Sequence, residues 1–365
     1  MPVSVGELIS GPTLNQLVDR LVDGFAAADG RTAQASANGH ASHEPATGAA
    51  ANGNDLRSGL ATGLNGEGQS HGKANGTGAD EFRPILRPAG DTASSAPGQW
   101  LIAPRPNPRA KVRLFCFPFA GGGVVSFRSW PQLLGDSVEV LAVEAPGRGT
   151  RINEPPIGDL GTFVQALLPE LIERLDRPSA FFGHCLGGLT MFATLRALPE
   201  AHAQVIRHLF ACGVRPPHLL KRRGAFEDEL IYDMMLHKEF DARLPPLAQS
   251  DDVFVEAIRH FDTPDADRML QIPKLRALML PTIRAEFGMA YNYVHQPVAP
   301  FRFPITSFVG HSDPWVSPGH SAAWSELTCG GFTSHLRQGS HFLMEDDRDF
   351  ILQTIRTEFV DLAAQ

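Results

Sequence analysis

The chain has 365 residues and a formal net charge of −8, because 40 Asp and Glu outnumber 32 Lys and Arg. This length allows two or three domains, and an acidic chain without a sustained Lys/Arg stripe argues against a nucleic-acid-binding protein. It contains no secretory leader and no apolar stretch long enough to span a bilayer, so we expect a cytoplasmic protein that does not contact a membrane. The four cysteines form no C-x-x-C pair, which argues against a zinc site and a disulfide framework.

The N-terminal part differs in composition from the rest of the chain. Residues 1–27 contain a helical repeat of apolar residues, which Gly11-Pro12-Thr13 precedes. Residues 28–97 are rich in Gly, Ala, Asn and Ser, and few of them are large and apolar, so they are predicted to form a disordered linker. The sequence thus predicts a short helical segment tethered to a globular domain over 98–365.

Predicted strands and helices alternate within this domain. An apolar stripe over 157–175 predicts a helix, and further helices are expected after Leu186 and after Phe342. Residues 215–298 are rich in Phe and Met and lack a strand pattern, so they are predicted to be a helical insertion. The alternation predicts an α/β fold with a mostly parallel sheet. Its strands are expected at 111–118, 138–144, 179–184, 206–214 and 304–310.

The clearest chemical motif is Gly183–Gly188 (GHCLGG), between a predicted strand and a predicted helix. It has the form of a nucleophile elbow, a strained turn in which small residues flank a reactive side chain at a helix N-terminus. Cys185 stands at the nucleophile position, where the helix dipole and a nearby imidazole favour the thiolate. The alternative is that Cys185 is a small buried apolar residue. The flanking glycines favour the nucleophile.

Acyl transfer in this type of fold requires an acid and then a base after the nucleophile in the chain. Asp313 follows a predicted strand, and His341 precedes the last predicted helix, so both stand at loop positions suited to these roles. Asp346 and Asp347 are rival acids, but they lie so close to His341 in sequence that we expect them on the following helix. We therefore predict a Cys185, Asp313, His341 triad.

The glycine-rich loop after the first predicted strand has two interpretations. A glycine run can cradle phosphate, but Gly121–Gly123 is not followed by Lys and Ser/Thr, which argues against a P-loop. The loop is instead expected beside the elbow, where the N–H of Ala120 and the N–H of Leu186 form an oxyanion hole. The histidines show no metal-ligand spacing, so no metal is expected.

Six short motifs occur from about residue 100 onward. They are Leu114–Gly123 (LFCFPFAGGG), Ala145–Gly149 (APGRG), Gly183–Gly188, Val214–Pro217 (VRPP), Gly310–Val316 (GHSDPWV) and Gly339–Phe342 (GSHF). Together they resemble the type II thioesterases of polyketide and nonribosomal peptide assembly lines. The resemblance implies an α/β-hydrolase fold with a helical lid at about 215–298. It also implies that Cys185, Asp313 and His341 form the triad and that Ala120 and Leu186 form the oxyanion hole.

The resemblance further implies the form of the substrate, an acyl group held as a thioester on the phosphopantetheine arm of an acyl or peptidyl carrier protein. It also implies that this chain binds no cofactor of its own. The family usually has Ser where this chain has Cys185. An acyl group on a cysteine remains an activated thioester, which a second thiol can capture. In this respect the chain resembles the cysteine-dependent aminoacyl transferases of syringomycin and coronatine assembly.

The cysteine therefore favours transfer of an acyl or aminoacyl group between carriers through a covalent Cys185 thioester. The alternative is an editing or releasing thioesterase, which hydrolyses or cyclises carrier-bound acyl chains. A carrier-binding module without activity is the third hypothesis, and the intact set of catalytic side chains argues against it.

Two further features point to carrier proteins. Residues 1–27 resemble the last part of a carrier domain without its phosphopantetheine attachment motif, so they are either a carrier-like remnant or a docking helix. Arg215, Lys221, Arg222 and Arg223 follow a predicted strand in an otherwise acidic chain. They are predicted to contact an acidic carrier protein or the phosphate of its arm, the alternative being a solvated turn.

Overall fold

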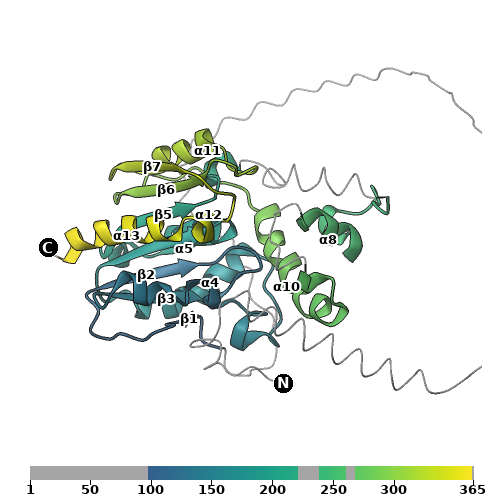
Figure 1. The fold of residues 1–365 in the computed structure, drawn as a ribbon, viewed down its shortest axis with the longest axis horizontal. Coiled ribbons are helices and arrows are strands. Elements are labelled where there is room, and N and C mark those ends of the chain that lie inside the picture. Colours follow the sequence, from purple (N-terminus) through teal and green to yellow (C-terminus); the bar gives the residue numbers. More distant parts are fainter. Residues whose placement is uncertain (1–97, 221–237, 260–267, 364–365) are drawn as a thin grey trace, which may run out of the picture. The chain divides into compact units, whose positions relative to one another are not determined.

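The computed structural model describes residues 98–220, 238–259 and 268–363 (Figure 1). The predicted N-terminal segment and linker, residues 1–97, therefore lie outside the described residues. A seven-stranded sheet in the order β1-β3-β2-β4-β5-β6-β7 forms the centre, and every neighbouring pair is parallel except β1 with β3. The strands are β1 (Leu101–Ile102), β2 (Val112–Phe117), β3 (Val138–Val143), β4 (Ser179–His184), β5 (Ile206–Cys212), β6 (Ile305–Gly310) and β7 (Phe332–Arg337).

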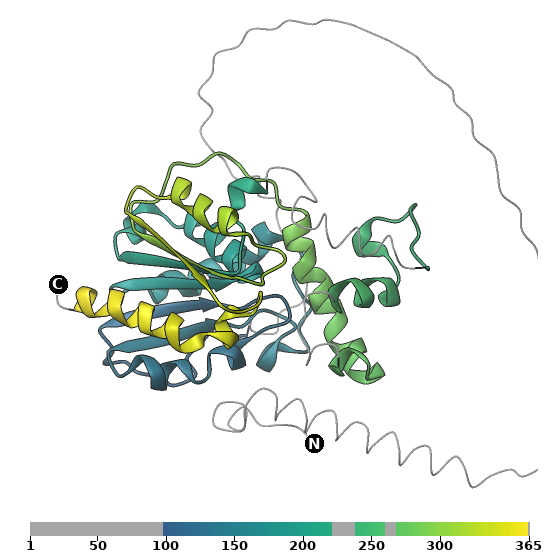
Figure 2. The same ribbon diagram turned by 45° about the horizontal axis from the view of Figure 1, so that its top comes forward.

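Helices cover both faces of the sheet. Helices α4 and α5 lie on one face, and α3 and α13 lie on the other (Figures 1 and 2). The α-helices are α3 (Trp130–Leu134), α4 (Leu160–Glu173), α5 (Leu186–Ala197), α6 (Glu200–Ala203), α8 (Asp251–Arg259), α10 (Pro273–Tyr291), α11 (Pro318–Ala322), α12 (Leu343–Asp346) and α13 (Arg348–Ala363), and the 3₁₀ helices are η1 (Val124–Phe127), η2 (Gly149–Arg151), η3 (Pro217–Leu219), η4 (Pro246–Ala248) and η5 (Ala323–Leu327).

Strand β2 illustrates why the central strands are continuous apolar runs. Its alternate residues Val112, Leu114 and Cys116 belong to the core beneath α3 and α13. Phe115 and Phe117 point the other way and join the core beneath α4 and α5. A strand covered on both faces has no solvent side, so both sets of side chains are apolar. The predicted α/β fold with a mostly parallel sheet is thus confirmed.

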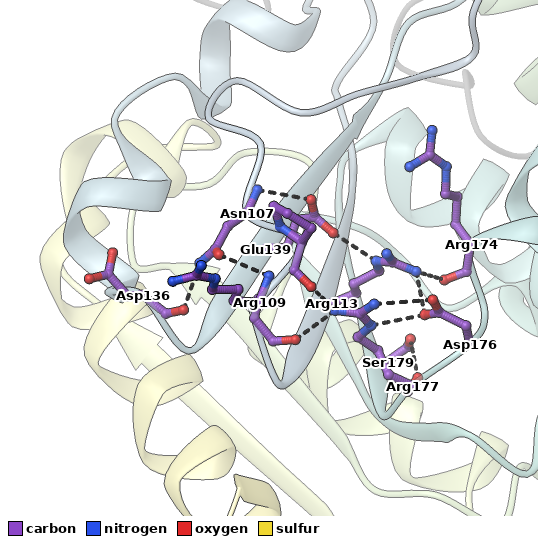
Figure 3. A network of polar contacts seen from close by, with 11 residues as sticks. Asn107, Arg109, Arg113, Asp136, Glu139, Arg174, Asp176, Arg177 and Ser179 are labelled. Carbon is purple, nitrogen blue, oxygen red and sulfur yellow. Dashed lines mark hydrogen bonds and ion pairs between the residues drawn. The ribbon is translucent and has the colours of Figure 1, made fainter.

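A network of charged side chains lies at the amino ends of the central strands (Figure 3). Arg113 on β2 places Nε 2.8 Å from Oε2 of Glu139 on β3, and its Nη1 lies 2.5 Å from Oδ1 of Asp176, just before β4. The side chains of Arg113 and Glu139 are each 6% exposed. The backbone N–H of Asn107 donates to Oε1 of Glu139. These contacts satisfy the buried charges and link three chain segments at the edge opposite the predicted site.

Between β5 and β6 the structure describes helices joined by turns and loops, and no strand within the described residues of this segment. Helices α8 and α10 lie side by side, apart from the layers that cover the sheet (Figures 1 and 2). They share a small core of their own, in which Phe254 of α8 contacts Phe287 of α10 edge to face with ring centroids 5.6 Å apart. None of the helices in the described part of the chain is long and apolar enough to cross a bilayer.

Candidate active site

The turn between β4 and α5 holds Cys185 in a strained backbone conformation. Its φ is 53° and its ψ is −121°, and within the described ranges it is the one residue other than glycine with positive φ. A β-carbon on Gly183 would lie 2.6 Å from the carbonyl oxygen of Gly187, and one on Gly187 would collide with the carbonyl oxygen of Phe117. The motif is glycine-rich because strand, turn and helix touch through their backbones. The Cys185 side chain stands at the N-terminus of α5.

Asp313 and His341 reach the same edge of the sheet from the loops after β6 and β7. Nδ1 of His341 lies 3.0 Å from Oδ2 of Asp313, and these side chains are 4% and 0% exposed. A carboxylate only accepts hydrogen bonds, so Nδ1 carries the hydrogen and Nε2 is left for Cys185. Oδ1 of Asp313 also accepts from the backbone N–H groups of Trp315 and Val316, at 2.9 and 3.0 Å. The carboxylate is thus held in a fixed position.

The rival acids are bound to other groups. Oδ2 of Asp346 accepts hydrogen bonds from the backbone N–H and the hydroxyl of Ser340, at 2.6 and 2.7 Å. Oδ2 of Asp347 pairs with Nε of Arg337 at 2.6 Å. The geometry therefore favours Asp313 as the partner of His341. The catalytic role of Asp313 stays a prediction.

The charge state of His341 depends on its two neighbours. Burial lowers the pKa of the imidazole, but the charge of the Cys185 thiolate and hydrogen bonds with Asp313 and Cys185 outweigh burial and raise that pKa to about 10. The pKa of Asp313 is lowered, because the hydrogen bond and charge of His341 and the two backbone donors outweigh the desolvation of its carboxylate. The arrangement thus favours an imidazolium on His341, held beside Cys185 and the Asp313 carboxylate.

His184, just before Cys185, supports the loop that carries His341. Its Nε2 lies 2.8 Å from the carbonyl oxygen of His341. A carbonyl only accepts, so Nε2 bears the hydrogen. Burial lowers the pKa of His184 to about 3, and the positive charge of His341 acts in the same direction. His184 is therefore neutral at pH 7 and anchors the backbone of the predicted base.

Two buried histidines predict a loss of stability in mild acid. Burial lowers the pKa of His208 on β5 to about 4 and that of His184 to about 3. Between about pH 6.5 and these values only the unfolded chain takes up the protons, so the free energy of unfolding falls as pH falls, by about 1.4 kcal/mol per pH unit for each histidine. Urea unfolding at pH 7, 6 and 5 measures this dependence.

The matched variant for this measurement is His208→Gln. Nε2 of His208 lies 2.8 Å from the Thr306 hydroxyl, and a glutamine amide preserves such a contact without taking up a proton. His208→Gln is expected to lose stability less steeply with acid, by about one proton's contribution. An unchanged slope would show that His208 titrates normally in the folded protein.

The predicted oxyanion-hole residues lie on either side of the turn. The N–H of Leu186 begins α5, and the N–H of Ala120 lies in the loop after β2; among the described residues neither forms a hydrogen bond. Gly187, next to Leu186, packs against the backbone of Phe117 and Pro118 just before Ala120. Two donors without partners on adjoining segments suit a developing negative charge. Their role stays a prediction.

Sequence reasoning missed Glu286, which lies on α10 within the predicted insertion. Its carboxylate accepts a hydrogen bond from the backbone N–H of Gly121 at 2.8 Å and pairs with Arg148 of the APGRG motif. The available signal is that Glu286 is an acidic residue between apolar neighbours in a helix. Such a residue is expected to be buried, and a buried carboxylate requires a cationic or hydrogen-bonding partner.

The predicted basic cluster is only partly described. Lys221, Arg222 and Arg223 lie outside the described residues. Nε of Arg215 donates to the carbonyl oxygen of Trp315 at 2.7 Å, next to the backbone N–H groups that hold Asp313. Carrier binding by these residues therefore stays a prediction. Within the described ranges, no group of three or more His, Cys, Asp or Glu side chains is placed to hold a metal.

Comparison with known proteins identifies the family. Residues 112–359 match the protein family described as thioesterase domain. The chain belongs to the thioesterase family. Its relatives include the gramicidin S biosynthesis protein GrsT of Aneurinibacillus migulanus, 29% identical over 70% of this chain and 92% of that protein. Thioesterase PikA5 of Streptomyces venezuelae is 31% identical over 68% of this chain and 81% of its own.

A solved structure shows the same fold. The type II thioesterase BorB from the borrelidin biosynthetic cluster superposes with a TM-score of 0.57, is 29% identical, and covers 71% of this chain and 95% of its own. As a thioesterase, this chain is an enzyme whose family acts on thioester bonds. The strained Cys185 and the His341–Asp313 pair lie at the sheet edge where such chemistry requires a nucleophile and a base.

Proposed function

We propose that this thioesterase is a type II thioesterase of a nonribosomal peptide or polyketide assembly line. It removes acyl groups from the phosphopantetheine arms of carrier proteins through a covalent thioester on Cys185. The single observation that carries this proposal is the strained Cys185 at the N-terminus of α5, coupled to His341 and through it to Asp313. The relatives reported above support hydrolysis rather than the transfer that the cysteine alone favours.

The geometry supports a two-step reaction. Sγ of Cys185 attacks the thioester carbonyl, and the oxygen of the tetrahedral intermediate accepts hydrogen bonds from the N–H groups of Ala120 and Leu186. As the carbon–sulfur bond to the arm breaks, the His341 imidazolium gives its proton to the pantetheine thiolate. His341 then takes a proton from water, whose oxygen attacks the acyl-Cys185 thioester. The bond between the acyl carbon and Sγ of Cys185 then breaks, the acid is released, and Cys185 is left beside the His341 imidazolium as at the start.

Mass spectrometry of the intact protein tests this proposal. The protein is mixed with acyl-loaded carrier, and the reaction is quenched with acid during the first turnover. We expect the mass to rise by that of the acyl group, and peptide mapping to place the acyl group on Cys185. If the carrier loses its acyl group while the mass of the enzyme stays constant at every quench time, the covalent route is wrong.

Transfer between carriers is the second candidate, and the cysteine itself favours it. An acyl group on Cys185 is a thioester, so its capture by the thiol of a second arm is nearly balanced in free energy. An oxygen ester at a serine would make the return to a thioester unfavourable, which leaves water as the productive acceptor. Closure over the acyl-enzyme by the helical segment that holds α8 and α10 would favour transfer by excluding water.

A donor carrier with a radiolabelled acyl group and an empty acceptor carrier separate the two candidates. If transfer dominates, label accumulates on the acceptor, and Cys185→Ser inverts the ratio of transfer to hydrolysis. Free acid as the main product in the presence of acceptor would leave hydrolysis as the function. The control is a reaction with the same amount of acyl-loaded donor carrier and no acceptor carrier. It gives the rate of hydrolysis alone.

A further inference from the structure

The loop that holds Ala120 is a tight turn with little intrinsic stiffness. The N–H of Gly122 donates to the carbonyl oxygen of Phe119 at 2.9 Å, and φ of Gly121 is +90°, which is the pattern of a type II turn. Glycines 121–123 impose no steric preference on this turn. The peptide between Ala120 and Gly121 therefore needs an external contact to fix its orientation.

Glu286 supplies that contact from a helix far away in the sequence. Its Oε2 accepts the N–H of Gly121 at 2.8 Å. Arg148 orients the carboxylate with two bonds, from Nε to Oε1 at 2.9 Å and from Nη2 to Oε2 at 2.5 Å. Both side chains are 9% exposed. A buried, bidentate pair with a third hydrogen bond is held in one geometry.

Packing around the turn is incomplete. Ala120 packs against the core beneath α4 and α5 and against the core that α8 and α10 share. A small cavity of about 30 Å³ nevertheless adjoins the loop, lined by residues that include Phe119, Gly122, Leu186 and Met289 together with Arg148 and Glu286. Space beside a loop weakens the packing that restrains it, so the hydrogen bond from Gly121 adds a directed restraint.

Helix α10 is fastened to the same region at a second point. The hydroxyl of Thr282 donates to the carbonyl oxygen of Gly147 at 3.3 Å, one turn before Glu286 on the helix. A β-carbon on Gly147 would collide with that hydroxyl. The helix therefore lies directly on the turn that presents Arg148, which fixes the position of the carboxylate relative to the sheet.

We propose that Glu286 is a positioning residue for the oxyanion hole. Held by Arg148, it fixes the Gly121 peptide and with it the N–H of Ala120, so that helix α10 of the inserted segment sets the geometry in which the tetrahedral oxygen is stabilised. This inference rests on the proposed function, because it assumes that Ala120 donates to that oxygen. Loss of an oxyanion-hole donor costs about 10²–10³-fold, so its misplacement is expected to cost about 10–100-fold.

Two double variants isolate the hydrogen bond to Gly121. Both contain Arg148→Met, so that no buried guanidinium loses its partner. In one, Glu286→Gln keeps an oxygen that accepts from Gly121; in the other, Glu286→Met has a similar shape and no acceptor. The single variants Glu286→Gln and Glu286→Met serve as a second matched pair if a double variant does not fold.

The readout is the affinity of each variant for octanal, measured as protection of Cys185 from iodoacetamide. The aldehyde adds to the thiol as a tetrahedral adduct whose oxygen occupies the oxyanion hole, whereas alkylation by iodoacetamide forms no such oxygen. We expect octanal to bind the Met variant at least about tenfold more weakly than the Gln variant. Alkylation without aldehyde is expected to be equal in the two.

The possible outcomes separate this inference from the proposed function. Equal octanal affinity in the matched pair, no protection in the wild-type protein, or a parallel loss of alkylation and protection would each overturn the positioning role. None of these measurements uses a carrier or a thioester. A wild-type protein that binds octanal as expected but is never acylated by a loaded carrier would contradict the proposed function and leave the role of Glu286 supported.

Discussion

Cys185→Ala is expected to abolish the acyl-enzyme and to lower thioester turnover by about 10⁴-fold or more, because loss of a nucleophile in acyl-transfer enzymes costs up to about 10⁶-fold. Alanine keeps the β-carbon of Cys185, so the backbone strain at φ 53° is unchanged. The substitution removes only the reactive Sγ. The measurement combines turnover of an acyl-loaded carrier with the intact mass after acid quench.

The matched control for this variant is Cys329→Ala. Cys329 is an exposed free cysteine, whereas Cys116 and Cys212 are buried within β2 and β5. Sγ of Cys329 donates a hydrogen bond to the carbonyl oxygen of Phe301 at 3.3 Å, far along the chain from the turn that holds Cys185. We expect Cys329→Ala to be acylated and to turn over as the wild type does. Substantial turnover by Cys185→Ala would instead indicate direct attack by water that His341 activates.

His341→Ala is expected to lower the rate of acylation by about 10²–10⁴-fold, the usual contribution of a positioned base. Two effects contribute, because in the proposed reaction the imidazolium lies beside Cys185 during its attack and then donates the proton to the leaving pantetheine thiolate. Asp313→Asn is expected to lower the rate less, because the imidazole of His341 remains beside the Cys185 thiol. The variant loses only the carboxylate that orients the ring and favours its positive charge. Single-turnover acylation by a loaded carrier measures both variants.

Asp347→Asn provides the control for the assignment of the acid. Asp347 is one of the two rivals near His341 in the sequence, and it pairs with Arg337 instead. We expect its substitution to leave the acylation rate within a few-fold of the wild type. A loss as large as that of Asp313→Asn would show that the acid of the triad has been assigned wrongly.

The central part of the fold was predictable because strands buried on both faces leave a strong apolar signal. β4 begins and ends where the pattern over 179–184 predicts, and the other central strands differ by one or two residues at their ends. β7 was missed because it reads Phe-Thr-Ser-His-Leu-Arg at the sheet edge, with several residues exposed, so neither an apolar run nor a clean alternation marks it. β1 has two residues and leaves no pattern at all.

The placement of the candidate site residues was predictable where they adjoin backbone features with a local signature. Gly183 and Gly187 mark the turn around Cys185 because no larger residue fits, and His341 and Asp313 follow strands in the order that the fold requires. The contact of Glu286 with Gly121 joins residues 165 positions apart. No local rule links such residues, since their proximity results from the packing of α10 against α5 and against the loops after β2 and β3.

The attachment of α10 to the loop after β2 has a consequence for how relatives of this enzyme diverge. Helices α8 and α10 lie between β5 and β6 in the sequence, so they can vary without altering the strand order. In this protein helix α10 provides the carboxylate that binds Gly121. On the role proposed for Glu286, a chimera that exchanges this segment for that of a relative is therefore expected to lose reaction rate, unless the donor brings an acid at the position of Glu286. Such a scaffold then accepts chiefly those exchanges of the segment that preserve this one side chain.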